Sequence, residues 1–145
     1  MNIGLLLNVN KHSNKLYGKT ITQVAEGYHR TKTEVDILLF LSRHPQYDTA
    51  REIVEIRGIT KSYVSKAVDS LVKAGLLETV SDQEDRRISH LRILPAAEEI
   101  VRRARKAQEA YFETVMKGIT QEEQNLLEDI LGRILENIAK AGERD

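Results

Sequence analysis

The fold is decided by residues 60–92, which read TKSYVSKAVDSLVKAGLLETVSDQEDRRISHLR. The first part of this stretch carries apolar residues at helical spacing: Val64, Ala67, Val68, Leu71 and Val72. This spacing predicts a helix with one buried face, which Thr60 can cap and Gly75 can end. The opposite face is polar or cationic, with Tyr63 at its edge: Lys61, Ser62, Ser65, Lys66, Asp69 and Lys73. We therefore expect a helix that offers a polar, partly cationic face to solvent.

A β-hairpin is predicted directly after this helix. Residues 76–80 and 88–94 shift toward alternation, with Leu91 and Ile93 on one side of the second strand. The turn between them, residues 82–87, reads DQEDRR and carries two arginines. A helix that can enter a major groove, beside a hairpin that can reach the adjacent minor groove, predicts a DNA-binding unit.

Two capped helices precede the deciding stretch. Residues 31–34 read TKTE, a capping box that opens a helix running to Arg43, and Pro45 then stops it. Residues 49–52 repeat the pattern as TARE and open a short helix, which Gly58 ends in the left-handed conformation. A short helix, a tight turn and an amphipathic helix together predict a helix-turn-helix.

Long helices are predicted at both ends of the chain. Apolar spacing places a first helix across about residues 5–28, and Pro95 fits the first position of a later helix that runs to about Lys117. The buried face of that later helix is expected at Ile100, Ala104, Ala107 and Tyr111. A third capping box at residues 120–123 opens a last helix to about Ala141.

The last helix carries an apolar stripe too broad to leave in water. Four of its members follow heptad-like steps: Leu127, Leu131, Ile134 and Ile138. Leu126, Ile130 and Leu135 lie beside them and widen the stripe. A small winged domain cannot cover a helix of this length, whereas a second copy of the chain can bury both stripes in a twofold interface. We therefore expect a homodimer.

These elements predict a mainly α fold with a small β wing, a winged helix-turn-helix plus N- and C-terminal dimerisation helices. We expect residues 1–30 to form the N-terminal dimerisation helix and residues 31–94 the winged helix-turn-helix DNA-binding domain. Residues 95–145 are expected to form the C-terminal dimerisation helices.

Composition narrows the classes of function. The 145 residues contain no cysteine, which excludes disulfides, thiolate metal sites and cysteine-based peroxide switches. The apolar run at residues 3–9 is too short to span a bilayer and has no signal-peptide pattern, so we expect a cytoplasmic protein without a membrane partner. The four histidines lack ligand spacing, and no Ser-His-Asp order with a nucleophile elbow appears. We expect no metal, no cofactor and no enzyme activity.

The net charge weakens a purely electrostatic case for DNA binding. The chain has 22 Lys and Arg against 22 Asp and Glu, whereas DNA-binding domains are often basic. From Arg57 to Gly75, however, there are four positive residues and one acid, Asp69, so the local net charge is +3. Affinity should therefore depend on two such units acting together across a dimer.

Residues 60–77, TKSYVSKAVDSLVKAGLL, followed by Asp85-Arg86-Arg87, resemble the MarR family of winged helix-turn-helix transcriptional regulators. The resemblance extends over nearly the whole chain. Its most specific parts are Lys-x-Gly-Leu at the end of the helix and the wing motif Asp-x-Arg. The chain departs from the family in lacking the cysteine of the oxidant-sensing branch. It also has Leu94-Pro95 in place of the polar cap usual after the second wing strand.

The resemblance implies a function and a mode of assembly. It implies a dimer with interlocked N- and C-terminal helices, which presents two winged lobes to a pseudo-palindromic operator in double-stranded DNA. Repression is the commoner role in the family, and many members respond to a ligand, so we expect a ligand-responsive repressor. Neither the operator sequence nor the regulated genes follow from the residues.

The resemblance also implies roles for individual residues. The expected DNA-binding residues are Lys61, Ser62, Tyr63, Ser65, Lys66, Lys73, Asp85, Arg86 and Arg87. The N-terminal end of the recognition helix would reach base edges or phosphates, while Lys61 and Lys73 would mainly contact phosphates. In the wing, Asp85 would hold the guanidinium of Arg87 toward the minor groove, and Arg86 would assist.

Regulators of this family commonly bind small aromatic or amphipathic effectors between the dimerisation helices and the winged lobe. The candidates for lining such a crevice are His12, Tyr17, Phe40 and Tyr111. Aromatic residues at helical spacing are also typical of plain core, so both interpretations stay open.

Two other functions are compatible with the sequence. One is a winged-helix protein-interaction module without sequence-specific DNA binding, which the neutral net charge would permit. The other, weaker hypothesis is an enzyme built on helices. DNA binding that weakens steeply with salt would distinguish the regulator from both.

Overall fold

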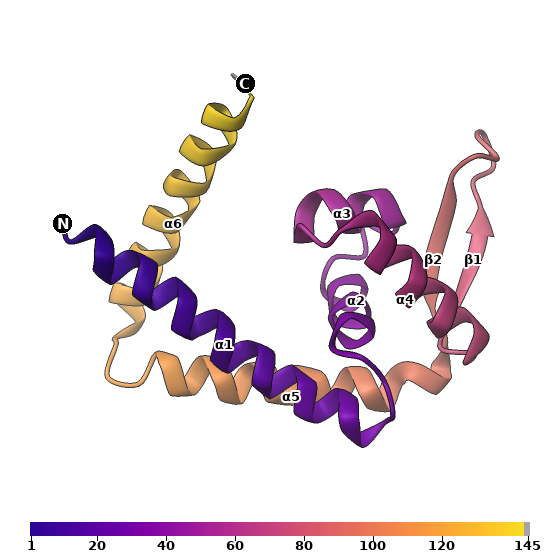
Figure 1. The fold of residues 1–145 in the computed structure, drawn as a ribbon, viewed down its shortest axis with the longest axis horizontal. Helices are drawn as coiled ribbons and strands as arrows, with labels where there is room; N and C mark the ends of the chain where they lie inside the picture. Colours follow the sequence, from indigo (N-terminus) through magenta and orange to yellow (C-terminus); the bar gives the residue numbers. More distant parts are fainter. Residues whose placement is uncertain (144–145) are drawn as a thin grey trace. The chain divides into compact units, whose positions relative to one another are not determined.

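Residues 1–143 are described by a computed structural model, in which helices predominate and a single two-stranded sheet forms the wing (Figure 1). The elements in chain order are α1 (Ile3–Gly27), α2 (Lys32–Arg43), α3 (Ala50–Arg57), α4 (Lys61–Lys73), β1 (Leu77–Ser81), β2 (Ser89–Ile93), η1 (Pro95–Ala97), α5 (Glu98–Val115) and α6 (Gln121–Gly142). This order confirms the predicted mainly α fold with a small β wing. No helix within these 143 residues is long and apolar enough to cross a membrane.

The chain divides into two units, Met1–Tyr111 and the part from Phe112 onward. The hydrophobic core lies in the first unit, where the largest fully buried side chains are Ile21, Ile37, Leu38, Ile53, Leu71 and Leu77. The second unit contains the end of α5 and the whole of α6. No described residue of α6 is buried within the chain.

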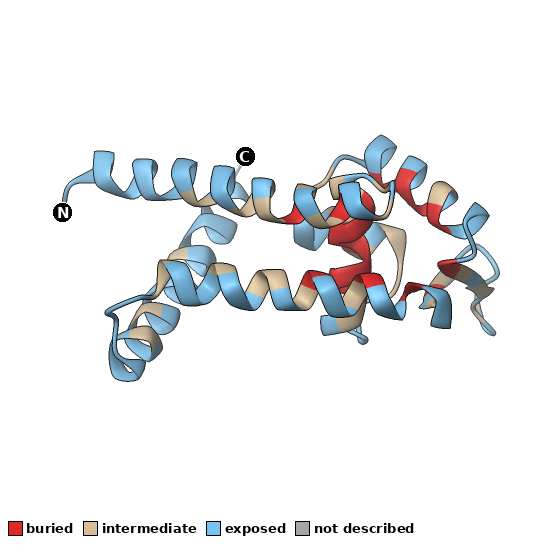
Figure 2. Ribbon diagram, turned by 90° about the horizontal axis from the view of Figure 1, so that it is seen from below, coloured by how far each residue is buried: buried red, intermediate tan, exposed pale blue. Residues whose placement is uncertain are grey.

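Helix α2 is the centre of the first unit. Every residue from Glu34 to Leu41 is buried, and α1, α4 and β2 all pack against this helix (Figure 2). Its two buried acids are each paired with a base one turn earlier. Arg30 Nη1 lies 3.1 Å from Glu34 Oε2, and Lys32 Nζ is bonded to Asp36 Oδ2. The pairing reduces the cost of burying these carboxylates.

The three predicted capping boxes are all formed, at Thr31, Thr49 and Thr120. In each, the threonine hydroxyl accepts the N–H of the glutamate three residues later, and that glutamate accepts the N–H of the threonine. The expected cap at Thr60 is different. Thr60 occupies the N-cap position of α4, but its side chain makes no capping bond.

Burial explains why α4 forms without that bond. Val64 and Leu71 are almost fully buried, so packing fixes this helix against the core. The apolar face predicted for α4 is correct except at Val72, which is 37% exposed and lies at the rim of the face. Gly75 closes this segment as predicted, and it does so with a positive φ of 72°.

The wing strands pair antiparallel with Thr79 opposite Leu91 and Val80 opposite His90. Leu91 is buried in the core, and its N–H donates to the carbonyl of Asp48 at 2.7 Å. This bond ties β2 to the loop before α3.

The helix predicted to start at Pro95 begins instead as the short 3-10 turn η1, with Pro95 at its first position, and α5 follows. Ile100 and Ala104 are buried as expected. Ala107 and Tyr111 are only partly buried, because the later turns of α5 run past the core.

Candidate nucleic-acid interface

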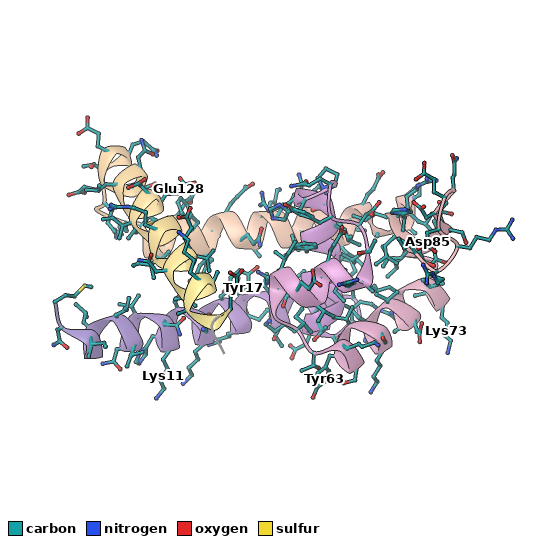
Figure 3. All side chains as sticks on the ribbon, turned by 90° about the horizontal axis from the view of Figure 1, so that it is seen from above. Lys11, Tyr17, Tyr63, Lys73, Asp85 and Glu128 are labelled. Carbon is teal, nitrogen blue, oxygen red and sulfur yellow. The ribbon has the colours of Figure 1, made fainter. Side chains whose placement is uncertain are left out.

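The outward face of α4 presents all six helix residues that the sequence proposed for DNA contact. Each of them is exposed: Lys61, Ser62, Tyr63, Ser65, Lys66 and Lys73. Tyr63 is 63% exposed, and both Tyr63 and Lys73 project outward from the ribbon (Figure 3). The buried face of the same helix is anchored in the core, so these side chains stand on a fixed scaffold.

An open basic cleft of about 710 Å³ lies beside the later turns of α4. Its lining consists of Arg30, Lys66, Asp69, Ser70, Lys73 and Ala74. The sequence interpretation missed Arg30, which comes from the turn before α2 and is far from α4 in the chain. Glu34 fixes Arg30 through the ion pair of the α2 start and also accepts a bond from Ser70 Oγ at 3.3 Å. Three cations and one acid make this cleft suited to phosphate oxygens.

The wing turn holds Arg87 by a bidentate ion pair with Asp85. Arg87 Nε lies 3.1 Å from Asp85 Oδ1, and Arg87 Nη2 lies 3.1 Å from Asp85 Oδ2. The N–H of Arg87 also donates to Asp85 Oδ1 at 3.0 Å. The side-chain bond from Arg87, followed by this backbone bond, lowers the pKa of Asp85. The predicted pairing is confirmed, and it leaves the Arg87 side chain 90% exposed.

Asp82 shapes the same turn from its other end. Its Oδ2 accepts the N–H groups of Glu84 at 3.0 Å and of Asp85 at 2.9 Å. The N–H of Ile88 donates to the carbonyl of Asp85 at 3.0 Å, and the N–H of Asp82 donates to the carbonyl of Ile88 at 2.9 Å. The turn that carries the arginine is therefore closed by several local bonds.

His90 connects this turn to the helix-turn-helix. Its Nδ1 lies 2.7 Å from Asp48 Oδ1 and its Nε2 lies 2.7 Å from Asp82 Oδ1. The sequence interpretation gave His90 no role and noted only that the four histidines lack ligand spacing. The signal was weak because Asp48 is 42 residues away in the chain. Of the two partners of His90, only Asp82 could have been suggested from the sequence, because it lies just across the turn of the hairpin.

A small cavity of about 170 Å³ lies among α1, α2, α3 and α5 of the first unit. It is lined by Tyr17, Asp36, Leu39, Phe40, Arg43, His44, Ile56, Arg57 and Gln108. Of the four aromatic candidates, Tyr17 and Phe40 line it directly. Tyr111 packs edge-on against Tyr17 with ring centres 5.2 Å apart. His12 is exposed on α1 and is bonded to the carbonyl of Asn8 at 2.8 Å, so it does not join the other three.

Polar groups of this cavity form a chain of bonds with one oxygen left over. Arg43 Nε donates to Gln108 Oε1 at 2.7 Å, and Gln108 Nε2 donates to the hydroxyl of Tyr17 at 2.7 Å. Among the buried side-chain nitrogen and oxygen atoms of the described residues, Asp36 Oδ1 is the one without a hydrogen-bond partner. A buried carboxylate oxygen in this state can accept a bond from a bound molecule.

The model of the MarR family matches residues 28–88, which span the helix-turn-helix and the wing turn. The transcriptional regulator AdcR of Streptococcus pneumoniae serotype 2 is 27% identical over 137 residues. The match covers 92% of this chain and 90% of that relative. The chain is therefore similar to MarR-family regulators over nearly its whole length, and its helix-turn-helix matches the family directly.

Solved structures of MarR regulators have the same fold. A putative MarR regulator from Listeria monocytogenes, crystallised with a 26mer DNA, superposes with a TM-score of 0.82 at 20% identity, covering 94% of this chain and 89% of that one. The transcriptional regulator PA3341 superposes with a TM-score of 0.81 at 25% identity. The match covers 96% of this chain and 99% of that one. The fold is that of MarR-family transcriptional regulators, and the relatives that match this chain are regulators rather than enzymes.

Nothing in residues 1–143 gathers three or more His, Cys, Asp or Glu side chains into a group that could hold a metal ion. The two carboxylates around His90 are therefore best understood as hydrogen-bond partners of its ring.

Proposed function

We propose that this protein is a MarR-type regulator: a homodimeric, ligand-responsive repressor that binds a pseudo-palindromic operator with one winged lobe on each half-site. The observation that carries the proposal is the bidentate Asp85–Arg87 pair, which holds an exposed arginine on the wing beside a helix with a polar, cationic outer face. Repression is proposed because it is the commoner role in the family.

The proposed contacts follow from where the side chains lie. Helix α4 enters the major groove, where its exposed polar residues reach base edges: Ser62, Tyr63, Ser65 and Lys66. The wing places Arg87 in the minor groove, with Asp85 as its support. The phosphate contacts come from Lys61, Lys73 and Arg86. The basic cleft adds Arg30 to this group.

Unpaired apolar surface at both ends of the chain supports the homodimer. Large exposed apolar residues of α1 are Ile3, Leu5, Leu6, Leu7 and Val9. Those of α6 are Leu126, Ile130, Leu131, Leu135 and Ile138. Many large apolar side chains left exposed on one helix are typical of an interaction site. Residues 1–30 and 95–145 are accordingly proposed as the dimerisation helices, around the DNA-binding domain of residues 31–94.

The cavity beside Tyr17 supports a small effector. Its volume of about 170 Å³ suits a single aromatic ring with small substituents. Tyr17 and Phe40 provide ring contacts, Arg43 and Arg57 can attract a carboxylate, and the spare oxygen of Asp36 can accept a hydroxyl hydrogen. A phenolic acid carries all three of these features.

Titration against the DNA upstream of the protein's own gene tests the regulator. Fluorescence anisotropy at several salt concentrations should give affinity that falls steeply with salt, because binding releases counterions from phosphates. A scrambled DNA of the same length should bind much more weakly. Equal, weak binding to both DNAs would favour the alternative, a winged-helix module for protein interaction.

Thermal unfolding with phenolic acids tests the effector. A ligand that binds only the folded state raises the melting temperature, and the rise grows with the logarithm of the ligand concentration above its dissociation constant. Tyr17→Phe removes the hydroxyl bonded to Gln108 and should weaken the shift, whereas His12→Ala should leave it unchanged. An absence of any shift at millimolar concentrations would count against this cavity as the effector site.

A further inference from the structure

His90 is the one ring in the wing that is bonded at both nitrogens to carboxylates within the described residues. Asp48 Oδ1 lies 2.7 Å from Nδ1, and Asp82 Oδ1 lies 2.7 Å from Nε2. A neutral imidazole has one N–H and can donate to only one of them, while an imidazolium donates to both. The geometry therefore fits the charged ring.

The bonds of His90 continue to the wing arginine. We name the five residues Asp48, His90, Asp82, Asp85 and Arg87 the His90 network. Asp82 is bonded to the ring through Oδ1 and to the N–H of Asp85 through Oδ2. The carboxylate of Asp85 then holds the guanidinium of Arg87. The network joins the loop before α3 to the exposed tip of the wing.

A second bond fixes the starting point of the network. The carbonyl of Asp48 accepts the N–H of Leu91, the residue after His90, at 2.7 Å. Asp48 itself stands directly before Thr49, the cap of α3. The side chain and the backbone of Asp48 therefore both hold β2, from a loop that is set by the helix-turn-helix.

We propose that His90, in its imidazolium form, is a positioning residue for DNA binding: it fixes the wing turn to the helix-turn-helix, so that Arg87 is presented in one conformation and DNA affinity depends on pH. This inference rests on the proposed contact of Arg87 with DNA. His90 touches neither Arg87 nor the expected path of the DNA bases; it acts through Asp82 and Asp85. Loss of its proton removes one of its two carboxylate bonds.

The charges around His90 set the direction of the pH effect. The bond to Asp48, then the bond to Asp82, raises the pKa of His90 above its ordinary value of 6.5. The bond from His90, followed by the N–H groups of Asp85 and Glu84, lowers the pKa of Asp82 to about 2. These two carboxylates are the charges that favour the imidazolium. The elements packed against β2 also carry Lys32, Glu34, Asp36 and Arg43 on α2, Arg51, Glu52, Glu55 and Arg57 on α3, and Glu78 on β1.

The pH range follows from these directions. Because the pKa of His90 is raised by folding, its contribution is complete below pH 6.5 and is lost as the pH rises through the raised value. Because the pKa of Asp82 is depressed, its contribution is complete above its ordinary value of 3.8 and is lost only near pH 2. The network is therefore intact in mild acid and weakens toward alkaline pH.

The test compares the wild-type protein with His90→Gln in operator titrations from about pH 5.5 to 9 at fixed ionic strength. The ratio of the two affinities cancels the titration of other histidines and of the DNA. At the acid end the wild type should bind about three- to tenfold more tightly, as expected for a partly exposed charge-assisted network. The ratio should approach one at the alkaline end. A ratio that does not change with pH would overturn the proposal.

The same comparison in an Arg87→Ala background separates the inference from the proposed function. If His90 acts through Arg87, His90→Gln should have no further effect once Arg87 is absent. Failure of Arg87→Ala alone to weaken binding would contradict the wing contact itself. If Arg87→Ala weakens binding but His90→Gln still weakens it further in the Arg87→Ala background, the positioning role of His90 would be contradicted.

A titration of the wild-type ring keeps the proposal testable if His90→Gln does not fold. Nitrogen-15 NMR of the imidazole should give a midpoint for His90 above 6.5, with both nitrogens protonated at pH 6. The backbone amide of Arg87 should shift with the same midpoint, because the wing turn responds to the ring. A midpoint at or below 6.5, or an Arg87 amide that does not follow it, would overturn the proposal.

Discussion

At the scale of single residues, Asp85 has two opposite effects on DNA binding: its charge repels DNA, and its bonds position Arg87. DNA is a polyanion, so a carboxylate on a turn that faces it should weaken binding, and its removal should strengthen binding. Asp85 holds Arg87 with two side-chain bonds and one backbone bond. If the positioned arginine outweighs the repulsion, removal of this carboxylate weakens binding instead.

Asp85→Asn is therefore expected to lower operator affinity about three- to tenfold, because the amide cannot hold the guanidinium as a bidentate carboxylate does. The matched control is Glu84→Gln, which removes the same charge from the same turn. Glu84 takes part in the turn through its N–H rather than through its carboxylate, so binding should be unchanged or slightly tighter. Anisotropy measures both, and tighter binding by Asp85→Asn would contradict the positioning role.

Arg87→Ala should lower operator affinity by on the order of tenfold, because it removes the group proposed for the minor groove. Circular dichroism and the oligomeric state should not change, since the side chain is 90% exposed. Arg92→Ala is the comparison on the same hairpin. Arg92 is also an exposed arginine paired with an acid, Glu78, but it lies in the strand rather than in the turn. Equal losses for both variants would indicate a general charge effect.

At the scale of elements, the caps of α3 and α4 differ although both helices follow a threonine. Thr49 accepts the N–H of Glu52 at 3.2 Å, whereas the Thr60 side chain makes no capping bond. The short helix α3 depends on its cap. The longer helix α4 is fixed by four buried residues on one face: Val64, Ala67, Val68 and Leu71.

Thr49→Ala should lower the free energy of unfolding by about 0.5–2 kcal/mol, the usual range for loss of an N-cap. Thr60→Ala should change it by much less, because no capping bond is lost. Urea unfolding without DNA measures both variants under identical conditions. A loss at Thr60 as large as that at Thr49 would mean that Thr60 caps α4 in solution.

At the scale of the whole molecule, the exposed apolar residues of α6 predict association of two copies. Leu131 and Ile138 are 49% and 63% exposed and lie seven residues apart on one face of the helix. Charged residues at these positions would be harmless on a monomer and disruptive inside an interface.

The double variant Leu131→Glu with Ile138→Glu should therefore shift the protein from dimer to monomer at micromolar concentration. Light scattering coupled to size exclusion measures the mass. Asn125→Glu adds the same kind of charge on the opposite face of α6 and should leave the dimer intact. A wild-type protein that is monomeric at this concentration would contradict the dimer directly.

The sequence by itself determined the features that depend on neighbours in the chain. Capping boxes join residues three apart, the Asp85–Arg87 pair joins residues two apart, and Gly58 and Gly75 mark left-handed turns. Periodicity separated the buried and exposed faces of α4, because side chains three and four apart share a face. These local rules predicted the order of the elements and the arginine turn of the wing.

Only the tertiary structure decided which distant residues meet. Arg30 joins the cleft beside α4, His90 bonds Asp48 across 42 residues, and Asp36 lines a cavity built from four helices. Such contacts depend on how α2 is surrounded in the core, and no spacing in the chain encodes them. Packing also replaced a local rule at Thr60, where burial of α4 made a side-chain cap unnecessary.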